Sequence, residues 1–482
     1  MKLLILIIYF AVMIGIGLYC RKHATDVNGF VLGGRSVGPW LTAFAYGTSY
    51  FSAVVFVGYA GQFGWKYGIS ATWAGIGNAI IGSLLAWVVL GRRTRIMSQH
   101  LNSATMPQFF GERFGSSALK IGASVIIFIF LIPYTASLYN GLSRLFGMAF
   151  NIDYSVCIIL MAVLTAIYVI AGGYMATAIN DFIQGIIMLF GIATVIAAVL
   201  NSKGGFMAAL DGLAKVSDPA VTDTPGIFAS FFGPDPLNLL FVVILTSLGT
   251  WGLPQMVQKF YAIKDEKSIK KGTIISTIFA LVVAGGSYFL GGFGRLFSDE
   301  IDVAANGYDS IIPTMLSGLS PMLIALVVIL VLSASMSTLS SLVIASSSTL
   351  TIDFLKDNFI KDMSDKKQVL SIRILVVVFI AISSILALIQ YKSSITFIAQ
   401  LMGVSWGALA GSFLAPFMYS LYSKRVTKAS CWVCFIFSSY DCKYFLQELI
   451  SDNYAVTYQL RCYCNACRTC NCSCSQPVHT KA

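Results

Sequence analysis

The chain has 482 residues, of which 57% are hydrophobic and only 11% are charged, and its net charge is +11. Soluble globular proteins carry about 25% charged residues, so the composition excludes that class and indicates a membrane protein with several spans. In a soluble protein the basic excess would suggest a nucleic-acid partner, but loop topology explains it in a membrane protein, and we expect no nucleic-acid partner.

Apolar segments of about 20 residues, the length that crosses a lipid bilayer, recur along the chain. We therefore predict an all-α polytopic membrane protein with about eleven transmembrane helices. No small-residue cleavage site follows residues 1–20, so the first segment is expected to remain as a helix. The predicted spans are residues 3–20, 39–61, 70–90, 119–139, 154–172, 182–200, 237–257, 272–294, 321–352, 370–390 and 395–422.

Basic residues gather in alternate connections between these spans. The basic connections lie near residues 21–35, 92–120, 259–271, 356–373 and 424–428. By the positive-inside rule these connections are cytoplasmic, so the amino terminus is expected outside the cell membrane and residues near 425 inside. Lys259 belongs to this basic set, and we expect no Lys or Arg at the middle of a span.

Two spans are interrupted by residues that weaken or break a helix. Residues 43–53 read AFAYGTSYFSA, and residues 246–255 read TSLGTWGLPQ, with two glycines and a proline near the middle. The interruptions open two successive groups of five spans, which predicts inverted repeats with a binding site between them at the midplane. The alternative is that each interruption is an ordinary kink.

The segment 333–341 reads SASMSTLSS inside an otherwise apolar run, so its hydroxyl groups must face something polar. Residues three and four apart share one helix face, which brings the oxygens of Ser337, Ser340 and Ser341 together. Convergent neutral oxygens suit a hard cation such as Na⁺. The alternative is that these small residues let two membrane helices pack closely.

Four motifs together resemble the sodium/solute symporter family, with most similarity to its proline and pantothenate branches, over residues 1–428. They are NGFVLGGRSVG at 28–38, AGGYMATAINDFIQ at 171–184, GTWGLP at 249–254 and MSTLS at 336–340. The resemblance implies a leucine-transporter-type core of two five-helix inverted repeats after one extra helix. The implied regions are the extra helix and loop, 1–38; the first repeat, 39–200; an extracellular loop, 201–236; the second repeat, 237–428; and an atypical tail, 429–482.

The resemblance also implies the ligands of a coupling sodium ion. They are the backbone carbonyls of Thr48, Phe51 and Ala334 and the hydroxyls of Ser337 and Thr338. Proton coupling needs a titratable group at depth, and all three histidines lie outside the predicted spans. Sodium is therefore the expected coupling ion.

A second sodium ion is implied by family members that pair an aspartate with serines. The matching residues here are Asp181, Ser337, Ser340 and Ser341. Asp181 is the acidic residue expected at the cytoplasmic end of the sixth span. The alternative is that Asp181 caps the amino end of that helix.

The resemblance places Tyr134 at a solute-facing position, and Tyr50, Thr246 and Trp251 flank the two interruptions. The alternative for Tyr134 is ordinary aromatic packing. Tyr50 stands where the proline symporters have an important aspartate, and Leu253 stands where they have glutamine, so the identity of the solute stays open. A solute carboxylate is expected to meet half-helix N-termini or neutral donors.

Beyond residue 428 the sequence departs from the family. This last segment holds most of the eleven cysteines. The closely spaced cysteines at 462–474 resemble a metal-binding tract, although out-of-frame sequence is the simpler interpretation, and we expect no metal other than sodium.

These observations predict sodium-coupled symport of a small organic solute, carboxylate or amino-acid-like, into the cell by alternating access. The alternative is a membrane-embedded solute sensor that does not transport. An enzyme is not expected, because no Ser, His and Asp set forms at depth.

Overall fold

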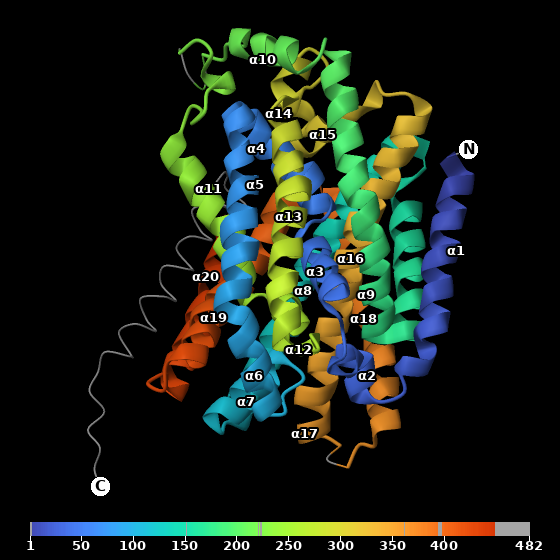
Figure 1. The fold of residues 1–482 in the computed structure, drawn as a ribbon, viewed down its shortest axis with the longest axis vertical. Coiled ribbons are helices and arrows are strands. Elements are labelled where there is room, and N and C mark those ends of the chain that lie inside the picture. The colour runs from blue at the N-terminus through green and yellow to red at the C-terminus, as the bar shows by residue number, and fades with distance from the viewer. Residues whose placement is uncertain are drawn as a thin grey trace.

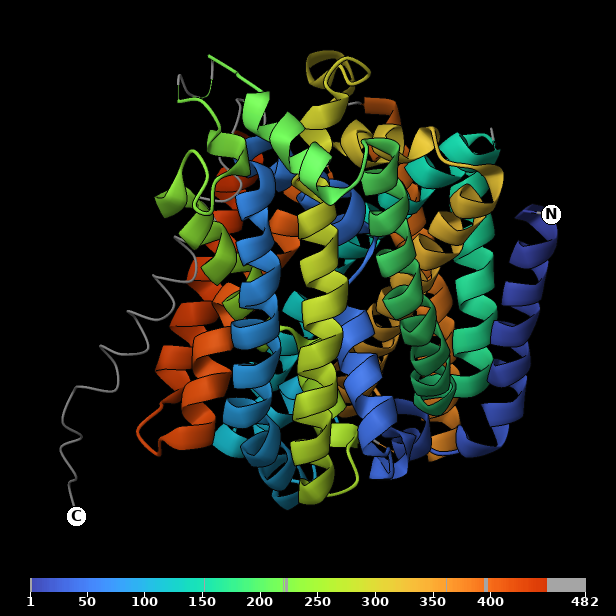
Figure 2. The same cartoon turned by 45° about the horizontal axis from the view of Figure 1, so that its top comes forward.

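The computed structural model describes residues 2–150, 152–219, 221, 224–360, 362–393 and 398–448. Within these residues the regular structure is helical, and the one pair of residues in β-type contact is Val37 and Ile263. Long helices stand side by side in a single bundle in both views (Figures 1 and 2). The fold class predicted from the sequence is confirmed.

The helix bounds are as follows. In the first part of the chain they are α1 Lys2–Cys20, α2 Val27–Leu32, α3 Pro39–Tyr50, α4 Ala60–Tyr67, α5 Thr72–Gly77, α6 Arg92–His100, α7 Met106–Phe114, α8 Ser117–Phe150, α9 Tyr154–Ser202 and α10 Phe206–Lys215. In the second part they are α11 Pro236–Leu248, α12 Pro254–Ala262, α13 Glu266–Gly291, α14 Val303–Asn306, α15 Ile311–Ser317, α16 Pro321–Thr349, α17 Lys356–Asn358, α18 Asp365–Ser393, α19 Ile398–Tyr422 and α20 Lys428–Glu448.

Both predicted interruptions are present. In the first, α3 ends at Tyr50 because Phe51 adopts an extended conformation, with φ −103° and ψ 129°, before π-helical turns lead into α4. In the second, α11 passes through a 3₁₀ turn at 249–252 to an extended Leu253, and α12 starts at Pro254 with a bend of 53°. Pro254 cannot donate to a preceding turn, which explains the stop.

Seven helices are long and apolar enough to cross a membrane, or eight if the bent pair α11 and α12 is one span, among the residues that the structure describes. Two of these seven contain a glycine with positive φ, Gly68 at 64° and Gly173 at 56°. Gly173 divides α9 into two arms, which appear as separate columns in Figures 1 and 2. The number of crossings therefore stays a prediction.

Helix α16 lies at the centre of the bundle, and every residue of it from Leu330 to Thr349 is buried. It packs against both arms of α9 and against α8, α3 and α18. Because its hydroxyl-bearing residues face neighbouring helices instead of lipid, their partners on those helices define the polar interior of the protein.

The described part of the carboxyl-terminal region forms one more helix against the bundle. In α20, Cys431 and Phe435 are buried, and the Phe435 ring packs on Phe413 of α19 with centroids 5.3 Å apart. The sequence of this segment was expected to be atypical, yet its first turns pack as an ordinary apolar helix. The cysteine tract at 462–474 lies outside the described residues.

The two ends of the bundle differ. One end carries α10, α14 and α15, and we call it the α15 end; the other carries α2, α6, α7 and α17, and we call it the α7 end (Figure 1). Helix α1 starts toward the α15 end and finishes toward the α7 end.

Candidate ion and solute site

A neutral oxygen cluster lies where the first interruption meets the centre of α16. Thr338 Oγ1 is 3.2 Å from the carbonyl oxygen of Thr48, 3.3 Å from that of Phe51 and 3.1 Å from that of Ala334. Ser337 Oγ lies 3.2 Å from the Thr48 oxygen and 2.9 Å from the Ala334 oxygen. The structure thus brings together all the residues expected to hold the coupling ion.

The interruption in the first helix makes these carbonyls available. The extended Phe51 stops the helical ladder, so the carbonyls at the end of α3 no longer meet amide groups of a following turn. Thr48, Phe51, Ala334 and Thr338 are at most 1% exposed. A dry set of carbonyl and hydroxyl oxygens without a carboxylate fits a monovalent hard cation.

A charged cluster lies one helical turn further along α16, at Ser341. Lys259 of α12 donates from Nζ to Ser341 Oγ at 2.9 Å, and its Nζ is 3.9 Å from Asp181 Oδ2. The Lys259 side chain is 1% exposed and that of Asp181 is 0% exposed. The expectation that Lys259 lies in a basic connection is therefore wrong. The chain continues after the break as helix α12, to Ala262, and α3, α6 and α16 pack around this helix.

The capping interpretation of Asp181 is also wrong. The second arm of α9 begins after Gly173, whose left-handed conformation ends the first arm, so Asp181 lies two turns inside a helix. The residue that caps α9 is Asp153, which accepts from the Ser155 amide. Two further carboxylates, Asp309 and Asp353, are buried as well.

Three of the four residues expected to face the solute meet between the two interruptions. Tyr50 donates from its hydroxyl to the Thr246 carbonyl at 2.5 Å. Trp251 donates from Nε1 to the Ile81 carbonyl at 3.0 Å, next to Gly82, where an added Cβ would lie 2.7 Å from the Tyr50 hydroxyl. These residues join the two broken helices to the segment after α5.

Tyr134 packs edge-on against Trp406 of α19, with ring centroids 6.0 Å apart. Its hydroxyl, the Trp406 Nε1 and the hydroxyl of Ser52 in the first break are buried close to one another, and none of them makes a hydrogen bond of ordinary geometry among the described residues. Buried polar atoms are normally paired, so a polar solute that reaches this place finds donors and acceptors to bond. Sequence reasoning did not single out Ser52, although it lies in the predicted first interruption, and it missed Trp406, whose local pattern resembles that of a packing residue.

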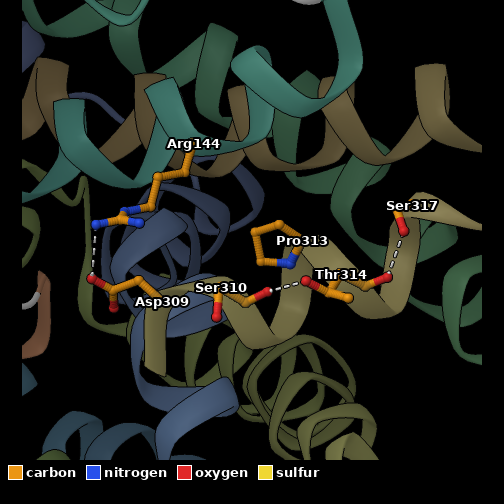
Figure 3. Close-up of a pocket in the computed structure, with 6 residues that line it drawn as sticks. All are labelled: Arg144, Asp309, Ser310, Pro313, Thr314 and Ser317. Atoms are coloured by element: carbon orange, nitrogen blue, oxygen red, sulfur yellow. Dashed lines mark hydrogen bonds and ion pairs between the residues drawn. The ribbon is translucent and has the colours of Figure 1, made fainter. Parts of the chain in front are cut away.

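A cavity of about 320 Å³ opens at the α15 end. Figure 3 shows its lining residues, which come from α8, from the turn before α15 and from α15 itself: Arg144, Asp309, Ser310, Pro313, Thr314 and Ser317. Arg144 lies 3.8 Å from Asp309, which also accepts from the Ile398 amide at 3.1 Å. Burial raises the pKa of the Asp309 carboxyl, and Arg144 and the Ile398 amide oppose that rise. These contacts tie α8, α15 and α19 together at this end.

Arg35 and Val37 close the α7 end. Arg35 donates to the Ser103 carbonyl at 2.6 Å and to Ser98 Oγ at 3.2 Å. Val37 pairs with the end of α12, through the Ala262 carbonyl at 3.3 Å and the Lys264 amide at 3.0 Å. The segment before the first broken helix is therefore bound to the segment after the second.

The chain is similar to proteins of known family over most of its length. Residues 30–436 match the sodium:solute symporter family. The osmoregulated proline transporter OpuE of Bacillus subtilis is 30% identical over 425 residues, which are 87% of this chain and 84% of that protein. A sodium/proline symporter of Staphylococcus aureus is 31% identical over 438 residues, 88% of this chain and 81% of that protein.

Among solved structures, a Na⁺-coupled sialic acid symporter in a substrate-bound, outward-open state superposes with a TM-score of 0.75. It covers 98% of this chain and 97% of its own, at 17% sequence identity. At that identity the likeness establishes the fold alone.

Proposed function

This chain belongs to the sodium:solute symporter family, and we propose that it carries a small amino-acid-like carboxylate, with L-proline as the first candidate, into the cell together with sodium. Sodium-coupled solute symport by a multi-pass membrane protein is what the family establishes. Two relatives that cover most of this chain are proline transporters, which supports the choice of solute. Tyr50 and Leu253, which depart from the proline pattern, are the reason to test pantothenate and other carboxylates beside it.

The observation that carries the proposal is the convergence of neutral oxygens around Thr338. We assign the coupling sodium ion to the carbonyls of Thr48, Phe51 and Ala334 and the hydroxyls of Ser337 and Thr338. Each of the three carbonyl oxygens lies within 3.3 Å of the Thr338 hydroxyl, and two of them lie within 3.2 Å of the Ser337 hydroxyl. The ligands come from a broken helix and from α16, so ion binding favours one relative position of the two.

The solute site lies between the two interruptions, near Tyr50, Thr246, Trp251 and Tyr134. Helix α12 begins in this region at Pro254, and a helix N-terminus favours a negative charge. Both polar atoms of the Gln255 side chain are buried there without a partner among the described residues. A carboxylate in this position would meet neutral groups, namely the amino end of α12 and the side-chain amide of Gln255.

Transport then proceeds by alternating opening of the two ends of the bundle. The α15 end, held by Arg144 and Asp309, is the extracellular one, and the α7 end, held by Arg35, is the cytoplasmic one. The basic connections at the α7 end support this orientation. The two proposed repeats, 39–200 and 237–428, move against each other so that only one end is open at a time.

Uptake into proteoliposomes tests the function. Labelled L-proline, pantothenate, sialic acid and short monocarboxylates are offered with and without an inward sodium gradient, and we expect one of them to accumulate only with the gradient. Binding without accumulation would favour the solute-sensor alternative. Accumulation to the same level with and without the sodium gradient would contradict the proposal.

A further inference from the structure

Lys259 is a cation buried inside the bundle. It lies on α12 with its ammonium group against Ser341 of α16, at 2.9 Å, and over the ring of Tyr174, 5.1 Å from its centroid. A buried ammonium is costly unless a negative charge compensates it. The compensating group is the Asp181 carboxylate, 3.9 Å away.

Asp181 depends on Lys259 in turn. Both of its carboxylate oxygens are buried and accept no hydrogen bond among the described residues, and Lys259 is the cation within ion-pair distance there. Of the tyrosines nearby, Tyr168 donates its hydroxyl proton to the Met336 carbonyl at 2.8 Å and the Tyr9 hydroxyl accepts from Gln184 at 2.8 Å. The Tyr174 hydroxyl is not hydrogen-bonded to Asp181 either. The two charges therefore balance one for one.

The hydrogen-bond partners of Ser49 and Lys259 indicate that Ser341 accepts from Lys259. Ser49 donates its single hydroxyl proton to the Ala45 carbonyl at 2.6 Å, so in its 2.9 Å contact with Ser341 it is the acceptor. Ser341 then donates to Ser49 and accepts from Lys259. The ammonium charge is thus connected by hydrogen bonds to α3, at the residue after the Thr48 sodium ligand.

This arrangement occupies the place expected for a second sodium ion. Of the expected ligands, Ser341 and Asp181 both face the Lys259 ammonium. A sodium ion among these residues would share Asp181 with a fixed positive charge at close range, and the repulsion between like charges is strong where water is absent. The residues that are present do not fit a second sodium ion.

We propose that the Lys259 ammonium is a tethered cation that replaces a second sodium ion, so that this symporter binds one mobile sodium ion, at Thr338. This inference rests on the proposed sodium site. Lys259 neutralises Asp181 throughout the cycle without leaving, and one sodium ion drives each turnover.

Equilibrium binding of ²²Na⁺ to the purified full chain in lipid nanodiscs tests the proposal. The measurement is made at pH 8.5, with choline as the replacing cation and no solute, so it does not depend on knowing the substrate. We expect one ion per protein for the wild type and two for Lys259→Met, which removes the charge but keeps the length of the side chain. Lys264→Met, at a half-exposed lysine near the same end, is the matched control and keeps one.

A double variant, Lys259→Met with Asp181→Asn, removes both charges and is expected to bind one ion again. Two ions on the wild type, or one ion on a folded Lys259→Met protein, would overturn the proposal. If Lys259→Met does not fold, the wild-type stoichiometry still decides between one ion and two. No sodium binding to the wild type would contradict the proposed sodium site itself, so the two failures are distinguishable.

Discussion

The two polar clusters on α16 lie one turn apart and both use serine or threonine hydroxyls. One cluster contains no charged side chain, whereas the other contains an ion pair. At Ser337 and Thr338 the facing segment is the end of α3, which contributes backbone carbonyls because the helix stops at Phe51. At Ser341 the facing segment is α12, which contributes an ammonium group. The neighbour that a hydroxyl meets therefore decides whether the cation is mobile or built in.

The largest expected effect comes from breaking the charge pair. Asp181→Asn leaves Lys259 buried without a counter-charge, and removing one partner of a buried pair costs about 3–5 kcal/mol of the free energy of unfolding. Adding Lys259→Met is expected to restore much of that loss. The measurement is SDS-induced unfolding in mixed micelles for the two single variants and the double variant.

The exposed pair Lys264 and Asp265 supplies the control for this cycle, because its side chains are 50% and 49% exposed and 4.0 Å apart. Asp265→Asn is expected to leave the free energy of unfolding close to that of the wild type, because solvent screens exposed charges. An Asp181→Asn protein as stable as the wild type would show that the two buried charges are not coupled.

The neutral cluster is tested by Thr338→Val, which keeps the side-chain shape and removes the hydroxyl. Losing one polar contact to a charged group costs about 1.5–3 kcal/mol, so the sodium concentration for half-maximal uptake should rise roughly tenfold to a hundredfold. Thr42→Val is the matched control, since the Thr42 hydroxyl is buried in α3 but bonds to the Gly38 carbonyl at 2.9 Å. Equal sodium dependence in the two variants would argue against the assigned site.

Tyr50→Phe tests whether the region between the breaks binds solute and not the ion. Leaving the Thr246 carbonyl without its donor should raise the KM for the solute by about two- to tenfold and leave the sodium dependence unchanged. Tyr422→Phe removes a comparable bond, to the Val89 carbonyl at 2.5 Å and outside this region, and serves as the control. A shift in sodium dependence without a change in KM would move Tyr50 to the ion site.

The smallest effect is expected at the α15 end. The Arg144 side chain is 40% exposed and 3.8 Å from Asp309, so Arg144→Gln should lower the free energy of unfolding by less than about 1 kcal/mol. Asp309→Asn should cost more, because Asp309 is buried and its carboxylate accepts from Ile398. If Arg144→Gln lowered the free energy of unfolding as much as Asp181→Asn, burial would not decide how much an ion pair contributes to stability in this protein.

The neutral cluster was predictable from the sequence because its signals are local. Hydroxyls spaced along an apolar run and a polar, glycine-containing interruption predict a helix face and a break, and the family motifs place the ligands on them. The structure brings Thr48, Phe51, Ala334, Ser337 and Thr338 together as that reasoning expected.

The charged cluster was not predictable from the sequence, because the burial of Lys259 depends on helices that are distant in the sequence. Lys259 precedes a run of basic, exposed residues, and nothing local shows that α3, α6 and α16 cover its own turn. The error at Asp181 had a readable signal, since the Gly172–Gly173 pair, and not Asn180, separates the arms of α9. A glycine pair between two apolar arms is the better marker of a helix end.

The most direct test of the account is the simultaneous uptake of ²²Na⁺ and labelled L-proline, or the carboxylate that the panel identifies in its place, into proteoliposomes. The account predicts one sodium ion per solute molecule in the wild type and in Thr42→Val, and loss of both fluxes together in Thr338→Val at low sodium. Two sodium ions per solute, or Thr338→Val fluxes that match those of Thr42→Val, would contradict a single mobile cation at the neutral cluster.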